Sequence, residues 1–132
     1  GSCLRILEVE GSAIKAVFES KKGRAARGKE YQVTGSQNGE ILCFIVNFDD
    51  PEENLHAMTS FNGRILKNEQ GDQQIHTLWV LTRQFEDEAR SKPTQVWNSF
   101  LINTDVFTRA SGQISPCLPC LPWPMLAVCF VT

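Results

Sequence analysis

Residues 31–48 read YQVTGSQNGEILCFIVNF, and this stretch predicts a β-hairpin. Two runs with strand composition flank Asn38-Gly39, a dipeptide typical of tight hairpin turns because both central residues take positive φ. The second run, ILCFIVNF, is almost continuously apolar, which favours a strand that borders a core. The fold is therefore expected to consist of antiparallel strands joined by short turns.

The pattern continues on both sides of this hairpin. Further strands are expected at residues 3–9, 12–18, 56–67, 75–84 and 95–109, with a bend allowed at Asn62-Gly63. Helical periodicity is nearly absent, and the best helix candidate, residues 87–92, is short and polar. About seven strands without crossover helices predict an antiparallel meander, which either a sandwich or an up-and-down barrel would satisfy.

Composition indicates one ordinary globular domain. The chain has 132 residues, 42% of them hydrophobic and 21% charged, with a net charge of −2. This balance argues against a nucleic-acid partner, and the basic cluster in residues 21–29 is interpreted as a solvated loop. No run reaches the roughly 20 apolar residues that would span a membrane, and no signal peptide is visible. The odd count of five cysteines does not fit a simple disulfide framework.

Several short motifs, taken in order, resemble the avidin and streptavidin family of biotin-binding proteins. They are GSQNG (35–39), FIVNF (44–48), TSFNGR (59–64), IHTLWVLTR (75–83) and VFTR (106–109), with Asp105 eight residues after Trp97. The resemblance is good over residues 41–109 and weaker over 11–40. It implies an all-β, antiparallel up-and-down barrel of seven to eight strands that is secreted, forms a dimer or tetramer, and binds biotin in the barrel mouth without catalysis.

The same resemblance implies roles for individual side chains. Phe48 and Phe61 would wall the pocket, and Trp79 would lie at its depth. Asp105 would accept a hydrogen bond from a ureido N–H, and Thr59 would lie near the ligand sulfur. Trp97 would be contributed to the site of a neighbouring subunit. Aromatic walls suit a flat, apolar bicycle with a thioether, although the pattern alone favours simple core filling as the reason for the aromatic positions.

The match fails at the N-terminus, where the family has a strand reading about G-x-W-x-N-x-x-G-S. Ser12 could be the family Ser, but the spacing to Phe48 is then too short. The preferred register makes residues 3–9 the second family strand, 11–18 the third, and 19–30 the loop over the ligand. It puts Ala13 at the place of a family Tyr, Lys15 at that of a Ser or Thr, and Ser20 near the ligand carboxylate.

This register leaves out three donors to the urea oxygen. Each lost donor to a buried carbonyl costs about 1–3 kcal/mol. At 1.4 kcal/mol per decade, three lost donors weaken affinity by about two to six decades. The sequence therefore predicts biotin binding that is weakened or lost, with Lys15 as a speculative replacement donor.

The C-terminal stretch SPCLPCLPWPMLAVCFVT (115–132) allows several interpretations. Cys117-x-x-Cys120 is a weak metal motif because it lacks a second pair of ligands. A disordered extension or a lipid-anchor signal is also compatible with this composition. The fourth interpretation is a strand over residues 125–131 that lies beside the last strand and fills the place of the missing first one. The expected organisation is a barrel domain at 1–109 and an extension at 110–132.

Other functions remain open at this stage. One alternative is a carrier of another small apolar ligand, and another is an interaction module that has lost biotin binding. An enzyme is disfavoured because His56 and His76 are far apart in sequence and the carboxylates around Pro51 suit a solvated turn. Cys43 is expected to be buried and inert. Neither a metal nor a cofactor is expected, with biotin as ligand only.

Overall fold

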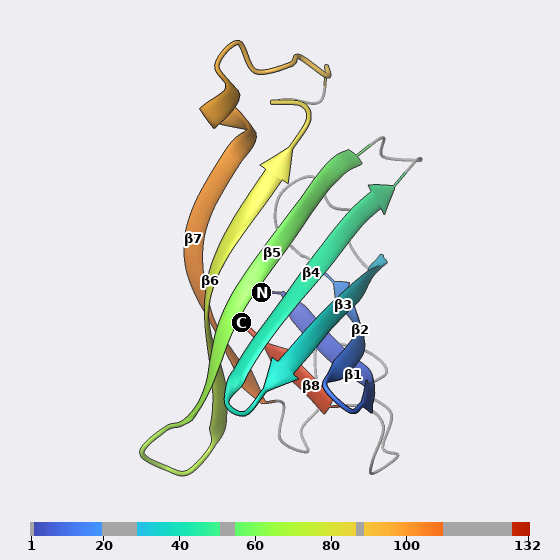
Figure 1. The fold of residues 1–132 in the computed structure, drawn as a ribbon. Coiled ribbons are helices and arrows are strands. Elements are labelled where there is room, and N and C mark those ends of the chain that lie inside the picture. The colour runs from blue at the N-terminus through green and yellow to red at the C-terminus, as the bar shows by residue number, and fades with distance from the viewer. Residues whose placement is uncertain (1, 20–28, 51–54, 87–88, 110–127) are drawn as a thin grey trace.

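The computed structural model describes residues 2–19, 29–50, 55–86, 89–109 and 128–132. These residues form eight strands that close into one antiparallel barrel, each paired with its sequence neighbours and β8 with β1 (Figure 1). The all-β up-and-down barrel predicted from sequence is thus confirmed. The strands are β1 (Cys3–Glu10), β2 (Ala13–Glu19), β3 (Glu30–Asn38), β4 (Ile41–Asp50), β5 (Leu55–Lys67), β6 (Gln73–Arg83), β7 (Phe100–Arg109) and β8 (Val128–Val131).

Tight turns close one end of the barrel. Gly39 has a φ of 58°, as the Asn38-Gly39 turn between β3 and β4 requires, and Asn38 pairs with Ile41 directly across it. The β1–β2 and β5–β6 turns lie at this same end and contain Gly11 and Gly71, also with positive φ. Because neighbouring strands are antiparallel, the connections after β2, β4 and β6 lie together at the opposite end, called the mouth below.

β8 lies between β1 and β7 and closes the barrel (Figure 1). Its Val131 pairs with Cys3 on one side and Thr108 on the other. The two ends of the chain also meet, since the Thr132 backbone N–H donates to the Ser2 carbonyl oxygen at 3.0 Å. Residues 125–127 of the predicted closing strand, and Cys117 and Cys120, lie outside the described residues. The domain boundary at residue 109 stays a prediction.

Alternating side chains of the strands fill the barrel. In β4 every second residue from Leu42 to Asp50 is buried, and the residues between them are exposed. At Gly35 and Gly63, atoms of the neighbouring strands lie so close to the backbone that a Cβ would not fit. A Cβ on Gly63 would lie 2.8 Å from Ile75 Cγ2, which explains this glycine by packing. Strand pairing runs through Asn62-Gly63 in continuous register, so no bend interrupts β5 there.

Three expectations about local structure were wrong. The strand predicted at 95–109 begins only at Phe100, and a 3₁₀ turn, η1 (Val96–Ser99), precedes it. The helix candidate at 87–92 is not helical in its described part, residues 89–92. Cys43 is free and exposed, because it lies on the outer face of β4 between two other apolar outer residues, Ile41 and Ile45. Within the described part of the chain, no helix is long and apolar enough to cross a membrane.

Candidate functional site

Five of the residues that the sequence proposes for a ligand site lie on four adjacent strands, with inward-facing side chains. Phe48, Thr59 and Phe61 are buried, with 8%, 6% and 4% of their surface exposed. Trp79 is partly buried and packs against the same core. Asp105 is half-buried and lies two residues from the fully buried Phe107. The predicted residues Phe48, Thr59, Phe61, Trp79 and Asp105 therefore share the barrel interior.

Phe61 is the centre of the aromatic packing. Its ring stacks on Phe44 with centroids 4.5 Å apart and an interplanar angle of 10°. Its other ring contacts are Phe18 at 5.9 Å, Phe107 at 5.8 Å and Trp79 at 6.4 Å. Phe48 and Phe61, the two predicted pocket walls, have Phe18 as a common neighbour, because the Phe18 and Phe48 ring centroids lie 6.1 Å apart. These rings therefore pack against one another as part of the hydrophobic core.

A hydrogen-bonded group lies at the depth of this cluster. The Trp79 indole Nε1 donates to Asp105 Oδ2 at 3.0 Å, and Thr77 Oγ1 donates to the Asp105 backbone oxygen at 2.9 Å. Thr77 and Asp105 are directly paired across β6 and β7. The Trp79 indole therefore orients the Asp105 carboxylate, while Thr77 holds the Asp105 backbone. The position of this carboxylate favours a ligand that donates N–H.

Thr77 was missed by the sequence interpretation. It is 4% exposed and is one of three buried polar or charged residues in the described chain, with Thr59 and Asp50. Its position two residues before Trp79 puts it on the same inward face of a well-alternating strand. That alternation was the signal that could have identified it.

Trp97 does not join the other site residues. It lies in η1, not in a strand, and 65% of its surface is exposed. The turn is attached to β6 by Arg83, whose Nε and Nη2 donate to the Asn98 carbonyl oxygen at 3.0 and 2.9 Å. A large exposed aromatic side chain on an anchored turn is suited to contact with another molecule.

The register proposed for the N-terminal strands was wrong for Ala13 and Lys15. Both are exposed, and the inward residues of β2 are Ile14, Ala16 and Phe18. The physical reason is that an unpaired lysine ammonium is costly to bury, whereas Phe18 gains by filling the interior. Lys15 therefore does not act as a donor inside the barrel. Ser20 lies outside the described residues.

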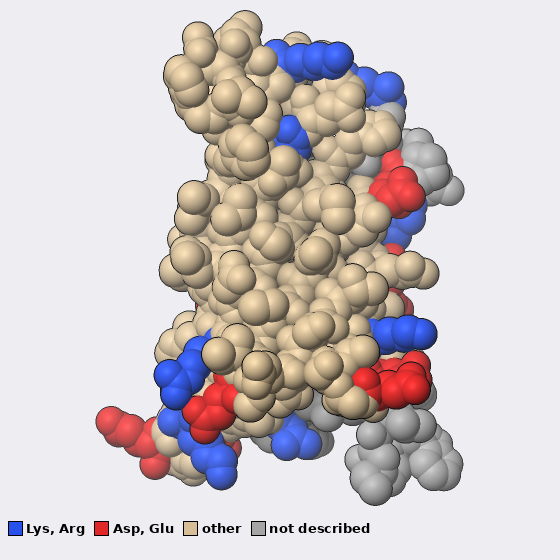
Figure 2. All heavy atoms as spheres, viewed as in Figure 1, with Lys and Arg blue, Asp and Glu red and all other residues tan. Residues whose placement is uncertain are grey.

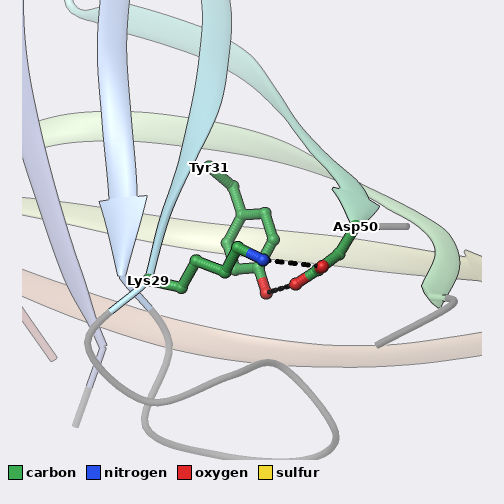
Figure 3. Close-up of polar contacts among 3 residues, drawn as sticks. All are labelled: Lys29, Tyr31 and Asp50. Carbon is green, nitrogen blue, oxygen red and sulfur yellow. Dashed lines mark hydrogen bonds and ion pairs between the residues drawn. The ribbon is translucent and has the colours of Figure 1, made fainter. Parts of the chain in front are cut away.

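A second buried polar cluster lies at the mouth (Figure 3). Asp50, 1% exposed, accepts hydrogen bonds from Lys29 Nζ at 2.7 Å and from the Tyr31 hydroxyl at 2.8 Å. The Tyr31 ring packs against Phe48 with centroids 4.9 Å apart. The sequence interpretation missed this cluster, since its members were assigned to a loop, a strand and a turn.

Two grooves lie along the outside of the barrel. One of about 620 Å³ is bordered by outward side chains of β4–β7 such as Cys43, Leu78 and Val106. Another of about 490 Å³ lies between the mouth ends of β4–β6 and η1. Among the described residues there is no group of three or more His, Cys, Asp or Glu that could hold a metal ion.

Comparison with known proteins gives a consistent result. The structure is similar to the rhizavidin–biotin complex, with a TM-score of 0.66, 22% identity, and coverage of 82% of this chain and 90% of that one. It is similar to apo Bradavidin2, with a TM-score of 0.63, 28% identity, and coverage of 83% and 89%. It is also similar to a biotin complex of a shwanavidin variant, with a TM-score of 0.63, 25% identity, and coverage of 82% and 86%.

A search of curated protein sequences finds no match to this chain. The model of the avidin family, in contrast, matches residues 1–110, which is most of the barrel. Together with the closed eight-stranded architecture, this match shows that the chain belongs to the avidin family.

Proposed function

We propose that this protein captures biotin non-covalently in the mouth of the barrel and catalyses no reaction. The observation that carries the proposal is the Asp105 carboxylate, held by the Trp79 indole at 3.0 Å inside an aromatic-rich barrel. A urea has two N–H donors that must be paired when buried, and a carboxylate accepts such bonds strongly. The family to which the chain belongs binds biotin, and this supports the assignment.

We further propose that the affinity is weak relative to the family. Ala13 has no side-chain donor and Lys15 faces outwards, so neither supplies a donor to the urea oxygen of the kind that the family has. The rings of Phe18, Phe44 and Phe61 are also in mutual contact, and a ligand must separate some of them to enter. Both effects reduce affinity, the first by about 1–3 kcal/mol for each lost hydrogen bond.

Titration with biotin, followed by tryptophan fluorescence, tests this proposal. We expect a saturable change that is largely lost in Trp79→Phe, because Trp79 hydrogen-bonds to the residue that would meet the ligand. Thr82→Ala is the matched control and should keep the change, because Thr82 is exposed on the outer face of the same strand. A flat titration in the natural sequence, with folded protein, would contradict the proposal.

We propose self-association through the outer face of β4–β7, with Trp97 contributed to the site of a neighbouring subunit. Figure 2 shows that the middle of this face has no charged side chain, while charges lie towards its ends and one edge. Exposed apolar side chains on these strands include Ile41, Ile45, Met58, Leu78, Ile102 and Val106. An apolar surface of this kind is typical of interfaces between subunits, and members of this family typically oligomerise.

Leu78→Lys is expected to reduce this self-association. Leu78 is 50% exposed in the middle of the face, and burying an unpaired ammonium there would cost several kcal/mol. Light scattering should report at least a dimer for the natural sequence and a smaller particle for the variant. Val9→Lys, at a similarly exposed apolar position on β1, should leave the mass unchanged. A monomeric natural protein, or an unchanged mass in Leu78→Lys, would contradict the interface.

A carrier of another small apolar ligand is the second candidate. The described interior has mostly aromatic and aliphatic side chains, with Thr59, Thr77 and Asp50 as its buried polar or charged residues. Such a lining accepts apolar ligands with few polar groups. Competition between biotin and a fluorescent apolar probe distinguishes the two candidates, because only the biotin site depends on Asp105.

We also propose that the protein acts outside the cell. Avidin family proteins are generally extracellular. Cys3, which is 3% exposed at the start of β1, is disulfide-bonded, and stable disulfides are typical of oxidising compartments.

A further inference from the structure

The mouth half of β7 has a neighbouring strand on one side only. β6 pairs with β7 from Phe100 to Thr108. On the other side, within the described chain, the four-residue β8 pairs only with Thr108 and Arg109. Figure 1 shows β7 continuing towards the mouth well beyond β8. Among the described residues, no strand therefore pairs with the second edge of residues 100–107.

Two hydrogen bonds indicate which backbone groups face this edge. The Asp105 carbonyl oxygen accepts from Thr77 Oγ1 of β6, so it is directed towards β6. The N–H of the preceding residue, Thr104, instead donates to the side-chain oxygen of Asn103 at 2.8 Å. In an antiparallel strand, the N–H and C=O of one residue point to the same side, and this side alternates along the chain. The even-numbered residues of 100–107 therefore direct both groups to the unpaired edge.

This edge is apolar and lacks the usual protection against pairing. Phe100, Ile102 and Val106 are 47%, 67% and 42% exposed. Residues 100–107 contain neither lysine nor proline, and their one charged residue, Asp105, is directed inwards to the Trp79 indole. An exposed apolar edge of this kind is a template for another strand.

The edge is complementary to a second copy of itself. An antiparallel pairing centred on Asn103 puts the even-numbered residues of the two copies opposite one another, which allows about eight backbone hydrogen bonds. The outer side chains then form apolar cross-strand contacts, and no like charges meet. The pairs across the two copies are Phe100 with Val106, Ile102 with Thr104, and Leu101 with Asp105.

We propose that β7 of one copy pairs antiparallel with β7 of a second copy, so that the sheets of two barrels become continuous. The Thr104 amide exchanges its Asn103 acceptor for a carbonyl oxygen of the second copy. Identical edges related by a two-fold axis form a self-complementary contact. The inference does not depend on biotin binding. It adds a second contact to the self-association proposed above, because the outer side chains of this edge are continuous with the apolar face of β4–β7.

Amide hydrogen exchange in dilute and in concentrated protein tests the pairing. The variant Leu78→Lys serves as background, because it removes the contact proposed for the outer face. The amides of Ile102, Thr104 and Val106 should exchange at least about tenfold more slowly in the concentrated sample. The amide of Asn103, which faces β6, is the internal control and should exchange slowly in both samples.

The substitution Thr104→Pro tests the same contact through particle mass. Proline removes an N–H at the unpaired edge and leaves the hydrogen bonds to β6 in place. Two independent two-fold contacts give about four chains per particle. Light scattering should therefore report about four chains for the natural sequence and for the control Thr104→Ala, and about two for Thr104→Pro. Thr104→Pro combined with Leu78→Lys should be monomeric.

Three results would overturn the inference. The first is fast exchange of the edge amides at both concentrations, and the second is equal mass of Thr104→Pro and Thr104→Ala. The third is slow exchange even in dilute, monomeric protein, which would mean that another segment of the same chain covers the edge. The exchange measurement leaves β7 unchanged, so it decides the question even if Thr104→Pro does not fold.

Failure of the contact through the outer face is distinguishable from failure of the edge pairing. In that case Leu78→Lys would leave the mass unchanged, while Thr104→Pro would still lower it. This result would support the edge pairing and refute the outer-face contact alone.

Discussion

Replacing Phe61 by alanine is expected to lower the free energy of unfolding by about 3–5 kcal/mol. Phe61 is 4% exposed and its ring contacts four others, so the change leaves a cavity where Phe44, Phe18, Trp79 and Phe107 converge. A single domain of this size usually has about 5–15 kcal/mol of stability, so the effect is large. Urea denaturation followed by circular dichroism measures it.

The control for this prediction is Phe100→Ala. Phe100 is 47% exposed at the start of β7, so its removal should change stability by about 1 kcal/mol or less. If Phe61→Ala cost no more than Phe100→Ala, the aromatic cluster would not be the core described above. A large cost would show that the Phe61 ring belongs both to the proposed pocket wall and to the hydrophobic core. Ligand binding and stability would then be coupled through this one side chain.

Asp105→Ala is expected to weaken biotin binding by on the order of 10- to 100-fold, because a hydrogen bond to a charged group contributes about 1.5–3 kcal/mol. The change removes the acceptor for a ligand N–H and leaves the Trp79 indole without its 3.0 Å partner. Competition with a labelled biotin derivative measures the ratio, and thermal unfolding of the variant checks that the barrel is intact.

Asp49→Ala is the matched control, because this carboxylate is exposed on the outer face of β4 near the mouth. It should leave biotin affinity within about twofold, since an exposed charge outside the site contributes little. Equal affinities of the natural protein and Asp105→Ala would mean that the ligand lies elsewhere, for example in the groove beside η1.

The parts of the fold that follow from local patterns were predictable. The Asn38-Gly39 turn needs positive φ, and the alternation of Ile75, Thr77 and Trp79 marks one inward face. The tail strand could be inferred because a barrel with one strand missing leaves an unpaired place between the first and last strands. The structure puts β8 in that place.

Other features depended on information that local patterns lack. In β2, alternation by itself separates Ile14, Ala16 and Phe18 from Lys15, but the register taken from the family motif turned the lysine inwards. In the first half of β4, residues 41–46, both faces are apolar, so the sequence could not show that Cys43 lies outside. Burial against a second subunit, as proposed above, would explain why this outer face is apolar.

The Lys29–Tyr31–Asp50 cluster and η1 are also products of tertiary contacts. Asp50 follows Lys29 by 21 residues, and no short-range pattern indicates that the two side chains pair. The turn that carries Trp97 is attached by Arg83, whose hydrogen bonds reach 15 residues along the chain to Asn98. Strand propensity in residues 95–99 was overridden by this attachment.

Calorimetric titration of the folded protein with biotin tests the central claim most directly. The account predicts a saturable heat with one ligand per barrel, a weaker affinity than the family's strong binders, and a marked loss of heat in Asp105→Ala. No heat at micromolar protein concentration, even with biotin in large excess, would contradict the assignment of this barrel as a biotin-binding protein.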